Sequence, residues 1–423
     1  MNETSSAGPR VVVAGWYGAT NFGDELLLAQ VVDWIRAGGG VPVAFSVNPA
    51  NTRRVHGIDA VALGDLPGIV EAMLAARLFL FGGGGLLQNY DALDPAHLGR
   101  FPAHNATLYA QYFFLAKELG LVTAVLAQGV GPLFSEGARR VAADVLRAAD
   151  YVSMRDDASA SLARDVGVDR RLPVAPDPGW SAARRLARLD LPAIDPALAG
   201  KRVLAVNLRR WPFDADWEER FANAFRGALP DGWVALWIDF QRTPNDDGSG
   251  YVDDEIASRM IQRLAEPGRH VLLAPANMRE AMDALVSCDA VLGMRLHAAL
   301  LGVAAGLPVL SLEYDDKVGA MMAQAGLPAA QRIALPEIAP RLRGALHALI
   351  GHGSRPMTPS PEVRLQLAEA ALLHRDILWQ AMQAARARTP PAAIAMPPIL
   401  SQWLDAQPAL APAIRSVLGS RVA

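Results

Sequence analysis

Short apolar runs alternate with longer stretches of helical spacing through most of the chain. In the first half, the runs that predict strands lie at residues 11–15, 41–46, 78–81, 122–127 and 151–154. In the second half they lie at residues 203–207, 233–238, 270–273, 290–292 and 309–312. This alternation is typical of parallel sheets built from strand–helix units. Runs such as VVVAG are apolar at every position, which predicts strands covered by helices on both faces.

The strand pattern is interrupted near residues 180–200, where the chain is rich in Pro, Arg and Ala. We therefore predict two Rossmann-like α/β domains, residues 1–185 and 200–355, whose parallel sheets face a ligand-binding cleft. A length of 423 residues also favours at least two domains. Residues 356–423 are predicted to form a C-terminal extension of helices and a Pro/Ala-rich linker. Its amphipathic segment, residues 400–418, could pack on another subunit or on a membrane surface.

Composition and charge limit which classes of partner and which cellular compartment we expect for this protein. The 40 basic and 43 acidic residues give a net charge of -3, so the chain has no bulk positive field for nucleic acid. Cys288 is the only cysteine, which excludes an intrachain disulfide and a multi-cysteine zinc site. Neither a signal peptide nor a membrane-spanning apolar run is evident, so we expect a cytoplasmic protein. Only three basic residues are lysines, so a lysine beside a predicted site is notable.

A first glycine-rich turn follows the opening strand, in the sequence AGWYGATNFGDELLL. Gly15, Gly18 and Gly23 permit tight turns and close approach of a ligand, and the following helix presents unpaired N–H groups. Asn21 and Asp24 are expected beside this loop, where they could bind a polyol, with Asp24 as a base. The alternative is that Asp24 caps the helix. The spacing differs from GxGxxG and does not indicate a dinucleotide site.

A second turn has four consecutive glycines, residues 82–85, after the apolar run LFLF. Such a turn costs backbone entropy, so either close packing or a ligand requires it, and we favour a ligand-facing loop. A Walker loop is excluded because no Lys-Ser or Lys-Thr follows. Gly83, Gly84 and Gln88 are therefore candidate binding residues.

The strongest group of polar residues lies in the sequence GMRLHAALLGVAAGLPVLSLEYDDKV. Arg295 and His297 follow one predicted strand at the start of a helix, and Lys317 follows the next strand. Because parallel strands end at the same edge of a sheet, we expect these three residues near one another. Arginine binds carboxylates or phosphates through a planar fork, and histidine transfers protons near neutral pH. The alternative for His297 is a histidine packed in the core.

Two further arginines follow predicted strands. Arg155 precedes a predicted helix, where a positive charge is unfavourable unless an anion or carboxylate lies nearby. Asp156 or Asp157 could supply that carboxylate. Arg209 follows the run VLAVNL and extends the predicted basic site.

At these residues the chain resembles the polysaccharide pyruvyltransferase family, and within it the cell-surface, CsaB-type branch. The matching segments are GWYGATNFGDELLL, FGGGGLLQ, VSMRDDAS, VNLRRW and GMRLHAALLGVAAGLPVLSLEYDDKV, in the same order and spacing, over roughly residues 11–320. The specific part is the Arg-Leu-His triplet followed by the lysine of a Tyr-Asp-x-Lys-Val segment. The chain departs from the pattern in GATN, where a Gly-Phe-Gly-Asn turn is more usual.

The resemblance implies a GT-B-like fold and transfer of a pyruvyl group from phosphoenolpyruvate to a sugar as a cyclic ketal, with release of phosphate. It implies that Arg155, His297 and Lys317 are catalytic. The residues predicted to bind phosphoenolpyruvate are Arg295, His297, Lys317 and Arg209. The residues predicted to bind the acceptor are Asn21, Asp24, Gly83, Gly84 and Gln88. We expect no metal and no cofactor, with phosphoenolpyruvate as a co-substrate.

Members of this branch act on a lipid-linked disaccharide, forming the ketal on N-acetylmannosamine of a secondary cell-wall polymer that anchors surface-layer proteins. The resemblance therefore implies a polyprenyl-linked, amino-sugar-containing glycan precursor, with peripheral contact at the inner face of the membrane; a homo-oligomer would be compatible with it. Two alternatives stay open. One is a GT-B glycosyltransferase that uses a nucleotide-sugar donor, and the other is a non-catalytic glycan-binding protein, against which the four basic site residues together argue.

Overall fold

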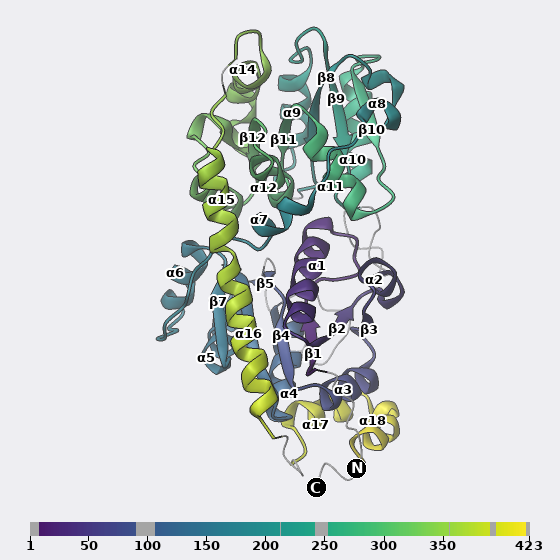
Figure 1. The fold of residues 1–423 in the computed structure, drawn as a ribbon, viewed down its shortest axis with the longest axis vertical. Coiled ribbons are helices and arrows are strands. Elements are labelled where there is room, and N and C mark those ends of the chain that lie inside the picture. The colour runs from purple at the N-terminus through teal and green to yellow at the C-terminus, as the bar shows by residue number, and fades with distance from the viewer. Residues whose placement is uncertain are drawn as a thin grey trace. The chain divides into compact units, whose positions relative to one another are not determined.

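The computed structural model describes residues 8–89, 106–211, 213–241, 253–354, 356–389 and 395–419. The chain forms two compact units, each built around its own sheet (Figure 1). Unit 1 comprises Met1–Ala19, Leu27–Pro178 and Ala371–Ala423, and unit 2 comprises Thr20–Leu26 and Gly179–Ala370. Each unit therefore combines separate parts of the sequence. We had predicted domains that are continuous in sequence, with boundaries at 185, 200 and 355.

Unit 1 holds, among the described residues, a seven-stranded parallel sheet in the order β3-β2-β1-β4-β6-β5, with β7 paired to β6. The strands are β1 (Arg10–Ala14), β2 (Val41–Ser46), β3 (Asp59–Ala62), β4 (Leu78–Phe81), β5 (Gly84–Asn89), β6 (Val122–Leu133) and β7 (Tyr151–Met154). The helices are α1 (Phe22–Ala37), whose first turn belongs to unit 2, α2 (Pro49–His56), α3 (Leu66–Ala75), α4 (Ala106–Glu118), α5 (Glu136–Ala148), α6 (Asp157–Asp165), α16 (Leu372–Ala387), α17 (Pro398–Ala406) and α18 (Ala411–Leu418).

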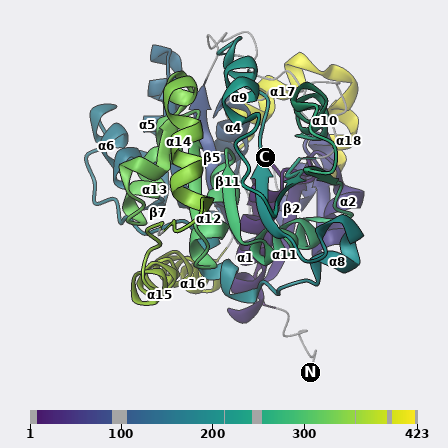
Figure 2. The same ribbon diagram turned by 90° about the horizontal axis from the view of Figure 1, so that it is seen from above.

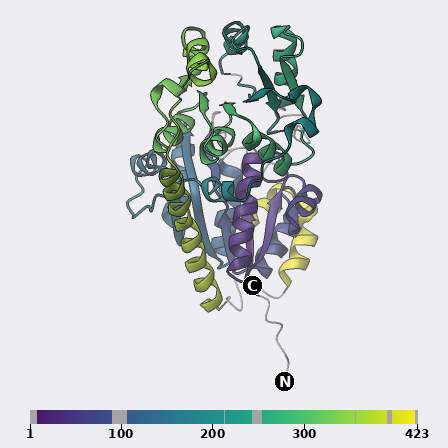
Figure 3. The ribbon, with the colours of Figure 1, turned by 45° about the horizontal axis from the view of Figure 1, so that its top comes forward.

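The first strand is apolar throughout because helices cover both of its faces. Val11 and Val13 pack in one core cluster with residues of α1 and α16, while Val12 and Ala14 pack in another with residues of α3, α4 and α5. All four side chains are fully buried. Figure 3 shows the olive-green α16 lying along the blue strands of this sheet, in contact with β6 and β7. Each valine stabilises the core by roughly 1.5–3 kcal/mol.

The C-terminal helices α17 and α18 pack on unit 1, where α17 contacts α4 and α18 contacts α3 (Figure 1). Leu400, Trp403, Ile414 and Leu418 are buried in the same core cluster as α3 and α4. The indole N–H of Trp403 donates a hydrogen bond of 2.8 Å to Oε1 of Gln111. These apolar side chains of the segment are thus covered by its own chain. Among the described residues, no helix is long and apolar enough to cross a bilayer.

Unit 2 holds, within the described ranges, a six-stranded parallel sheet in the order β10-β9-β8-β11-β12-β13. The strands are β8 (Arg202–Asn207), β9 (Trp233–Ile238), β10 (His270–Leu273), β11 (Ala290–Gly293), β12 (Val309–Glu313) and β13 (Arg332–Ala334). The helices are α7 (Gly179–Ala182), α8 (Leu191–Ile194), α9 (Trp217–Phe225), α10 (Asp253–Leu264), α11 (Met278–Ser287), α12 (Leu296–Ala304), α13 (Asp316–Gln324), α14 (Ile338–Ile350) and α15 (Pro361–Ala370). The predicted fold class, two parallel-sheet α/β domains with C-terminal helices, is confirmed.

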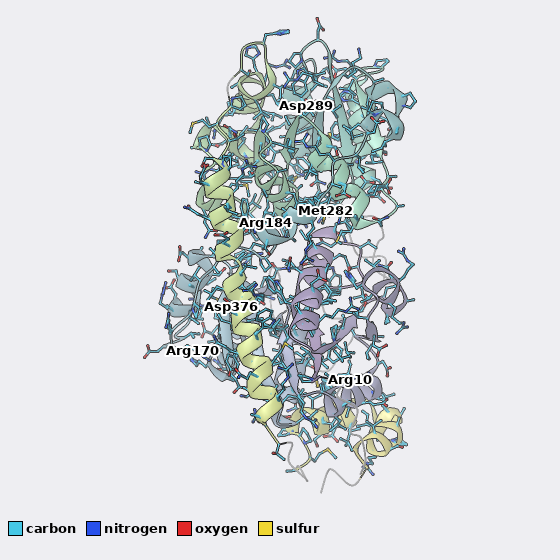
Figure 4. All side chains as sticks on the ribbon, in the orientation of Figure 1. Arg10, Arg170, Arg184, Met282, Asp289 and Asp376 are labelled. Carbon is cyan, nitrogen blue, oxygen red and sulfur yellow. The ribbon has the colours of Figure 1, made fainter. Side chains whose placement is uncertain are left out.

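The carboxylate of Asp289, labelled in Figure 4, joins the two central strands of unit 2. Asp289 lies one residue before β11 begins. Its carboxylate accepts a hydrogen bond of 2.7 Å from the N–H of Val203, at the start of β8. The strands therefore start in register, so their carboxyl ends, where Asn207 pairs with Gly293, meet at one edge of the sheet. The polar residues that follow these strands are brought together at that edge.

The second glycine turn differs from the expected loop. Gly84 already begins β5, which pairs with the second half of β6, while β4 pairs with the first half. The break between β4 and β5 is only Gly82 and Gly83. Gly83 and Gly84 have φ angles of 97° and 91°, which side chains rarely adopt, so the glycines allow the chain to break and resume beside the same strand.

Candidate active site

Arg295 lies in a buried ion pair at the end of β11. It is the residue before α12, and its Nε and Nη2 donate to the two carboxylate oxygens of Asp253 at 2.7 Å each. Nη2 also donates to Oε1 of Gln241 at 2.9 Å. The side chains of Arg295 and Asp253 are 7% and 2% exposed. Asp253 thus already engages the guanidinium fork that we expected to bind phosphoenolpyruvate.

Asn207 fixes the backbone beneath this pair. Its Oδ1 accepts from the N–H of Arg295 at 3.3 Å, and its Nδ2 donates to the carbonyl of Ile238 at 2.8 Å. Its own carbonyl accepts from the N–H of Met294 at 2.8 Å. One buried amide therefore joins the ends of β8, β9 and β11, and it sets where α12 begins.

The charge balance around Arg295 is favourable despite its burial. Burial alone lowers the pKa of Arg295, but the negative charge of Asp253 and its hydrogen bonds outweigh that effect, so the pKa lies above its ordinary value. Asp24 adds a further negative charge within electrostatic reach. Asp24, a predicted acceptor residue, and Arg295, a predicted donor residue, therefore lie in one neighbourhood of unit 2.

His297 occupies the first turn of α12 and is half-buried. A Cβ atom placed on Gly23 would lie 2.3 Å from Nδ1 of His297, so the imidazole packs directly on the backbone at the start of α1. The N–H of Phe22 donates to the carbonyl of Phe240 at 2.8 Å, and the two phenyl rings lie 6.0 Å apart. The start of α1 is thus held against the histidine that we predicted to be catalytic.

The N-terminal cap of α1 is Asn21, whose Oδ1 accepts from the N–H of Gly23 at 3.2 Å. Asn21 also contributes its carbonyl, which accepts from the N–H of Glu25 at 3.0 Å. Asp24 is half-buried within the first turn, so the alternative that Asp24 is the cap is wrong. Its negative charge contributes to raising the pKa of Arg295.

A cation–aromatic cluster forms where β8 and β12 end. Nη1 of Arg209 donates to the hydroxyl of Tyr314 at 3.1 Å, and the guanidinium carbon lies 4.8 Å from the ring centroid. Nζ of Lys317 lies 5.9 Å from the same centroid. Trp211 packs against Tyr314 with ring centroids 4.7 Å apart. Tyr314 therefore holds two of the predicted donor-binding cations on one aromatic ring.

These cations change the acidity of the phenol. Burial raises the pKa of Tyr314, but the positive charges of Arg209, Lys317 and Arg295 outweigh it, so the pKa lies below its ordinary value. Lys317 lies near the start of α13, where the helix dipole disfavours a cation. Its Nζ lies 3.2 Å from Oδ2 of Asp315, which also caps the helix through the N–H of Lys317. That carboxylate offsets the unfavourable position.

Arg155, the remaining predicted catalytic residue, belongs to unit 1 and follows β7. Its guanidinium lies 3.5 Å from Oδ2 of Asp156, which caps α6, and 3.6 Å from Oδ2 of Asp177. Both Arg155 and Asp177 are almost completely buried. A Cβ atom on Gly129 would lie 2.4 Å from Nη2 of Arg155, so the guanidinium rests on glycine backbone. The carboxylate expected near Arg155 is thus Asp156, joined by Asp177, and not Asp157.

The residues predicted to bind the acceptor at the second glycine turn also lie in unit 1. The carbonyls of Gly84 and Gly129 each accept from Nε2 of the buried Gln128 at 2.8 Å. Gly83 and Gly84 are buried, and Gln88 is half-buried on β5. Gln128 therefore connects the glycine turn to the backbone beneath Arg155.

The family becomes clear once this geometry is set beside known proteins. The model of the family described as "Polysaccharide pyruvyl transferase" matches residues 21–316, well over half of the chain. This chain belongs to the polysaccharide pyruvyl transferase family. The match contains Asn21, Asp24, Arg155, Arg295 and His297, and it ends one residue before Lys317.

One curated relative of this polysaccharide pyruvyl transferase family member is distant in sequence. The amylovoran biosynthesis protein AmsJ of Erwinia amylovora is 22% identical over 219 residues. That match covers 48% of this chain and 52% of the relative, so the chain spans about half the length of the curated relative it matches.

Solved structures share the fold of this family member at low identity. A UDP-GlcNAc 2-epimerase from Neisseria meningitidis is 10% identical, with a TM-score of 0.54 over 89% of this chain and 99% of that chain. A glycosyltransferase from Rickettsia africae is 10% identical, with a TM-score of 0.51 over 90% and 97%. These similarities establish a fold of the GT-B type and nothing about the reaction.

Two residues of this pyruvyl transferase family member became visible only in the structure. Asp253 has no motif and lies 42 residues before Arg295. Asn207 stands at a strand end, and that position is the signal that could have selected it. In the described part of the chain, no group of three or more His, Cys, Asp or Glu side chains could hold a metal ion.

A surface groove of about 780 Å³ lies between α9 and α14, which pack side by side (Figure 2). Its charged and polar lining residues are Arg220, Asn223, Arg343 and His347. None of the residues predicted to bind donor or acceptor lines it. Arg343 donates to the carbonyl of Arg226 at the end of α9, so it serves helix packing. We therefore place the candidate site at the strand ends.

Proposed function

We propose that this protein transfers the pyruvyl group of phosphoenolpyruvate to a sugar of a glycan precursor, forming a cyclic ketal and releasing phosphate. Membership of the polysaccharide pyruvyl transferase family supports the reaction class. The observation that carries the proposal is the cluster at the ends of β8 and β12, where Arg209 and Lys317 flank Tyr314 within electrostatic reach of Arg295. Phosphoenolpyruvate carries a carboxylate and a phosphate, and such a group of cations suits both.

In the proposed reaction, His297 protonates the methylene carbon of phosphoenolpyruvate, and positive character develops at C2. One sugar hydroxyl attacks C2, the bond from C2 to the phosphate oxygen breaks, and a second hydroxyl closes the ketal. The methylene gains one proton and the two hydroxyls lose two, so one proton leaves with phosphate. Imidazole suits the first step because it exchanges protons near neutral pH.

The cations would act on charge that develops during this transfer. Lys317 and Arg209 are proposed to bind the departing phosphate, because both lie at one ring and neither is fully buried. Arg295 is held by Asp253, so we propose that it contributes mainly positive potential and the position of His297 two residues further on. Asp24 is proposed as the base that accepts a proton from the sugar hydroxyl.

The acceptor is the less defined substrate. The relative AmsJ is named as an amylovoran biosynthesis protein. For this chain we propose a glycan precursor, with a polyprenyl carrier and N-acetylmannosamine as the narrower expectation from the CsaB-type resemblance. Asn21, Gly83, Gly84 and Gln88 are the residues we propose for binding it.

The test measures phosphate release from phosphoenolpyruvate in the presence of a panel of glycan acceptors, with mass spectrometry of the product. We expect phosphate to appear only with an acceptor, together with a product heavier by one ketal-linked pyruvyl group. A parallel thermal-shift series compares phosphoenolpyruvate with UDP-sugars, because a ligand that binds the folded state raises its stability. A shift with UDP-sugars alone would instead support the glycosyltransferase alternative.

A further inference from the structure

A buried histidine on α16 lies outside the residues matched by the family model. His374 is fully buried, whereas Asp376, two residues further along the helix and labelled in Figure 4, is exposed. The family match ends at residue 316, so nothing in it assigns a role to His374. Buried histidines are uncommon unless both ring nitrogens have partners.

Both ring nitrogens of His374 have partners within unit 1. Nδ1 lies 2.8 Å from Oγ of Ser153 on β7. Nε2 lies 3.2 Å and 3.1 Å from the carbonyl oxygens of Ala175 and Pro176. A carbonyl can only accept, so Nε2 must carry the proton and donate. Nδ1 then accepts from the hydroxyl of Ser153, whose Oγ accepts from the N–H of Ala127 at 3.1 Å.

These hydrogen bonds join two segments that run side by side. Met154 of β7 forms a parallel bridge with Val174, and its N–H donates to the carbonyl of Pro173 at 2.8 Å. Each of these segments continues into a charged residue. Arg155 directly follows Met154, and Asp177 directly follows Pro176. Their side chains meet with Nη1 and Oδ2 at 3.6 Å. His374 thus fastens both segments next to the Arg155–Asp177 pair.

We propose that His374 is a positioning residue for Arg155. By joining Ser153 to the carbonyls of Ala175 and Pro176, it keeps Asp177 beside the guanidinium and so fixes where Arg155 points. The inference rests on the proposed function, with Arg155 taken to act in the reaction as the family resemblance implies. It also gives the C-terminal part of unit 1 a role in holding Arg155.

The charge state of the ring agrees with this geometry. Burial lowers the pKa of His374 to about 4, against smaller raising effects from the carbonyls of Ala175 and Pro176 and from the charge of Asp177. The positive charge of Arg155 lowers it further. The ring is therefore neutral at neutral pH, as a single proton on Nε2 requires.

The kinetic test compares three variants with the wild type. His374→Phe keeps the ring volume and removes both hydrogen bonds, while His374→Gln keeps an N–H group that can reach the carbonyls. Met382→Ala, two turns along α16 and fully buried, is the control for lost packing. We expect His374→Phe to lower turnover by about 10–100-fold and His374→Gln to lower it less, because small misplacements of a reacting group are costly. Met382→Ala should keep wild-type turnover below its melting temperature.

Coupling to Arg155 separates positioning from general stability. In an Arg155→Lys background, His374→Phe should cause little further loss, because the residue it positions is already changed. If the two losses multiply in full, or if His374→Phe retains wild-type turnover, His374 does not act through Arg155.

A measurement without substrate distinguishes this inference from the proposed reaction. In nitrogen-15 NMR, His374 should show a proton on Nε2 only and remain neutral at pH 6. The Nε–H signal of Arg155, assigned by its disappearance in Arg155→Lys, should shift in His374→Phe and stay in place in Met382→Ala. An unmoved Arg155 signal in His374→Phe overturns the inference even if pyruvyl transfer is demonstrated. If the wild type turns over no phosphoenolpyruvate but the Arg155 signal shifts in His374→Phe, the proposed reaction is overturned. The positioning of Arg155 by His374 is then still supported.

Discussion

Arg295 and Asp253 form a bidentate ion pair inside unit 2, with both nitrogen–oxygen distances at 2.7 Å. Asp253 is the first residue of α10, where the helix dipole favours a carboxylate, and Arg295 directly precedes α12, where the dipole disfavours a cation. The same carboxylate also accepts from the N–H of Phe240 at 2.9 Å. The pair therefore fixes two helix starts at the edge of the sheet that carries His297.

Asp253→Asn should destabilise the protein by about 3–5 kcal/mol, because it leaves the buried guanidinium of Arg295 without a countercharge. The free energy of unfolding in denaturant measures this. Glu255→Gln is the matched control, since Glu255 lies in the same helical turn but is exposed, and its stability should change by less than about 0.5 kcal/mol. Equal stability of the two variants would mean that the ion pair is not maintained in solution.

His297→Ala should abolish acceptor-dependent phosphate release, lowering it by roughly 100- to 10,000-fold, because the proposed proton donor is removed. The half-buried imidazole is not a core anchor, so circular dichroism and melting should show a folded protein. His352→Ala, at an exposed histidine of the same unit, serves as the control and should retain full turnover. Near-normal phosphate release by His297→Ala would refute its role as the acid.

Gly23→Ala should reduce activity by about tenfold or more, because the new Cβ would lie 2.3 Å from Nδ1 of His297 and push the ring from its position. Turnover and melting temperature are measured together. Gly344→Ala offers a comparison, since Gly344 lies in α14 and, apart from the adjoining helix backbone, nothing lies within 4 Å of its Cβ position. That control should gain about 0.5–1 kcal/mol of stability at unchanged turnover. Equal activity of the two variants would contradict the contact with His297.

Lys317→Arg should lower turnover by about 10–100-fold although the charge is retained, because a planar guanidinium cannot replace a compact ammonium beside Asp315 and Tyr314. Steady-state kinetics with varied phosphoenolpyruvate would show the loss. Lys201→Arg repeats the substitution at an exposed lysine and should have no effect. If both variants matched the wild type, Lys317 would be an ordinary surface lysine.

Stability should depend on pH through His374. Its pKa falls from the ordinary value of 6.5 to about 4 in the folded chain, chiefly because of burial. Between these values the unfolded chain binds a proton that the folded chain does not, so stability is full above pH 6.5 and declines as the pH falls toward 4. Compared with His374→Gln, the wild type should lose about 3 kcal/mol more between pH 7 and pH 4. Parallel pH dependence of the two unfolding free energies would argue against a neutral, buried ring.

The strands could be predicted because their signal is local. Each predicted strand corresponds to an observed one, since apolar runs such as residues 203–207 are buried by the sheet they form. β3 and β13 were missed because they are short edge strands, and β13 has only three residues, RIA. We predicted a loop at residues 82–85 because nothing in the local sequence shows that Gly84 pairs with β6.

The site was predictable only in part, for a related reason. Arg295, His297 and Lys317 stand out because two parallel strands place them at one edge. Their partners carry no such signal: Asp253 lies 42 residues from Arg295, and His374 lies 221 residues from Ser153. The sequence can suggest that a buried cation needs a carboxylate, but not which one.

What the sequence by itself determined is therefore the two-sheet α/β class, the family resemblance and the basic residues at strand ends, because each depends on neighbouring residues or on strand order. Only the tertiary structure decided that Asp253 engages the fork of Arg295, that Gly23 backs His297 and that His374 joins β7 to the segment bearing Asp177. Burial and hydrogen-bond distance between remote residues exist only once the chain has folded, and they determine how each charged group is held.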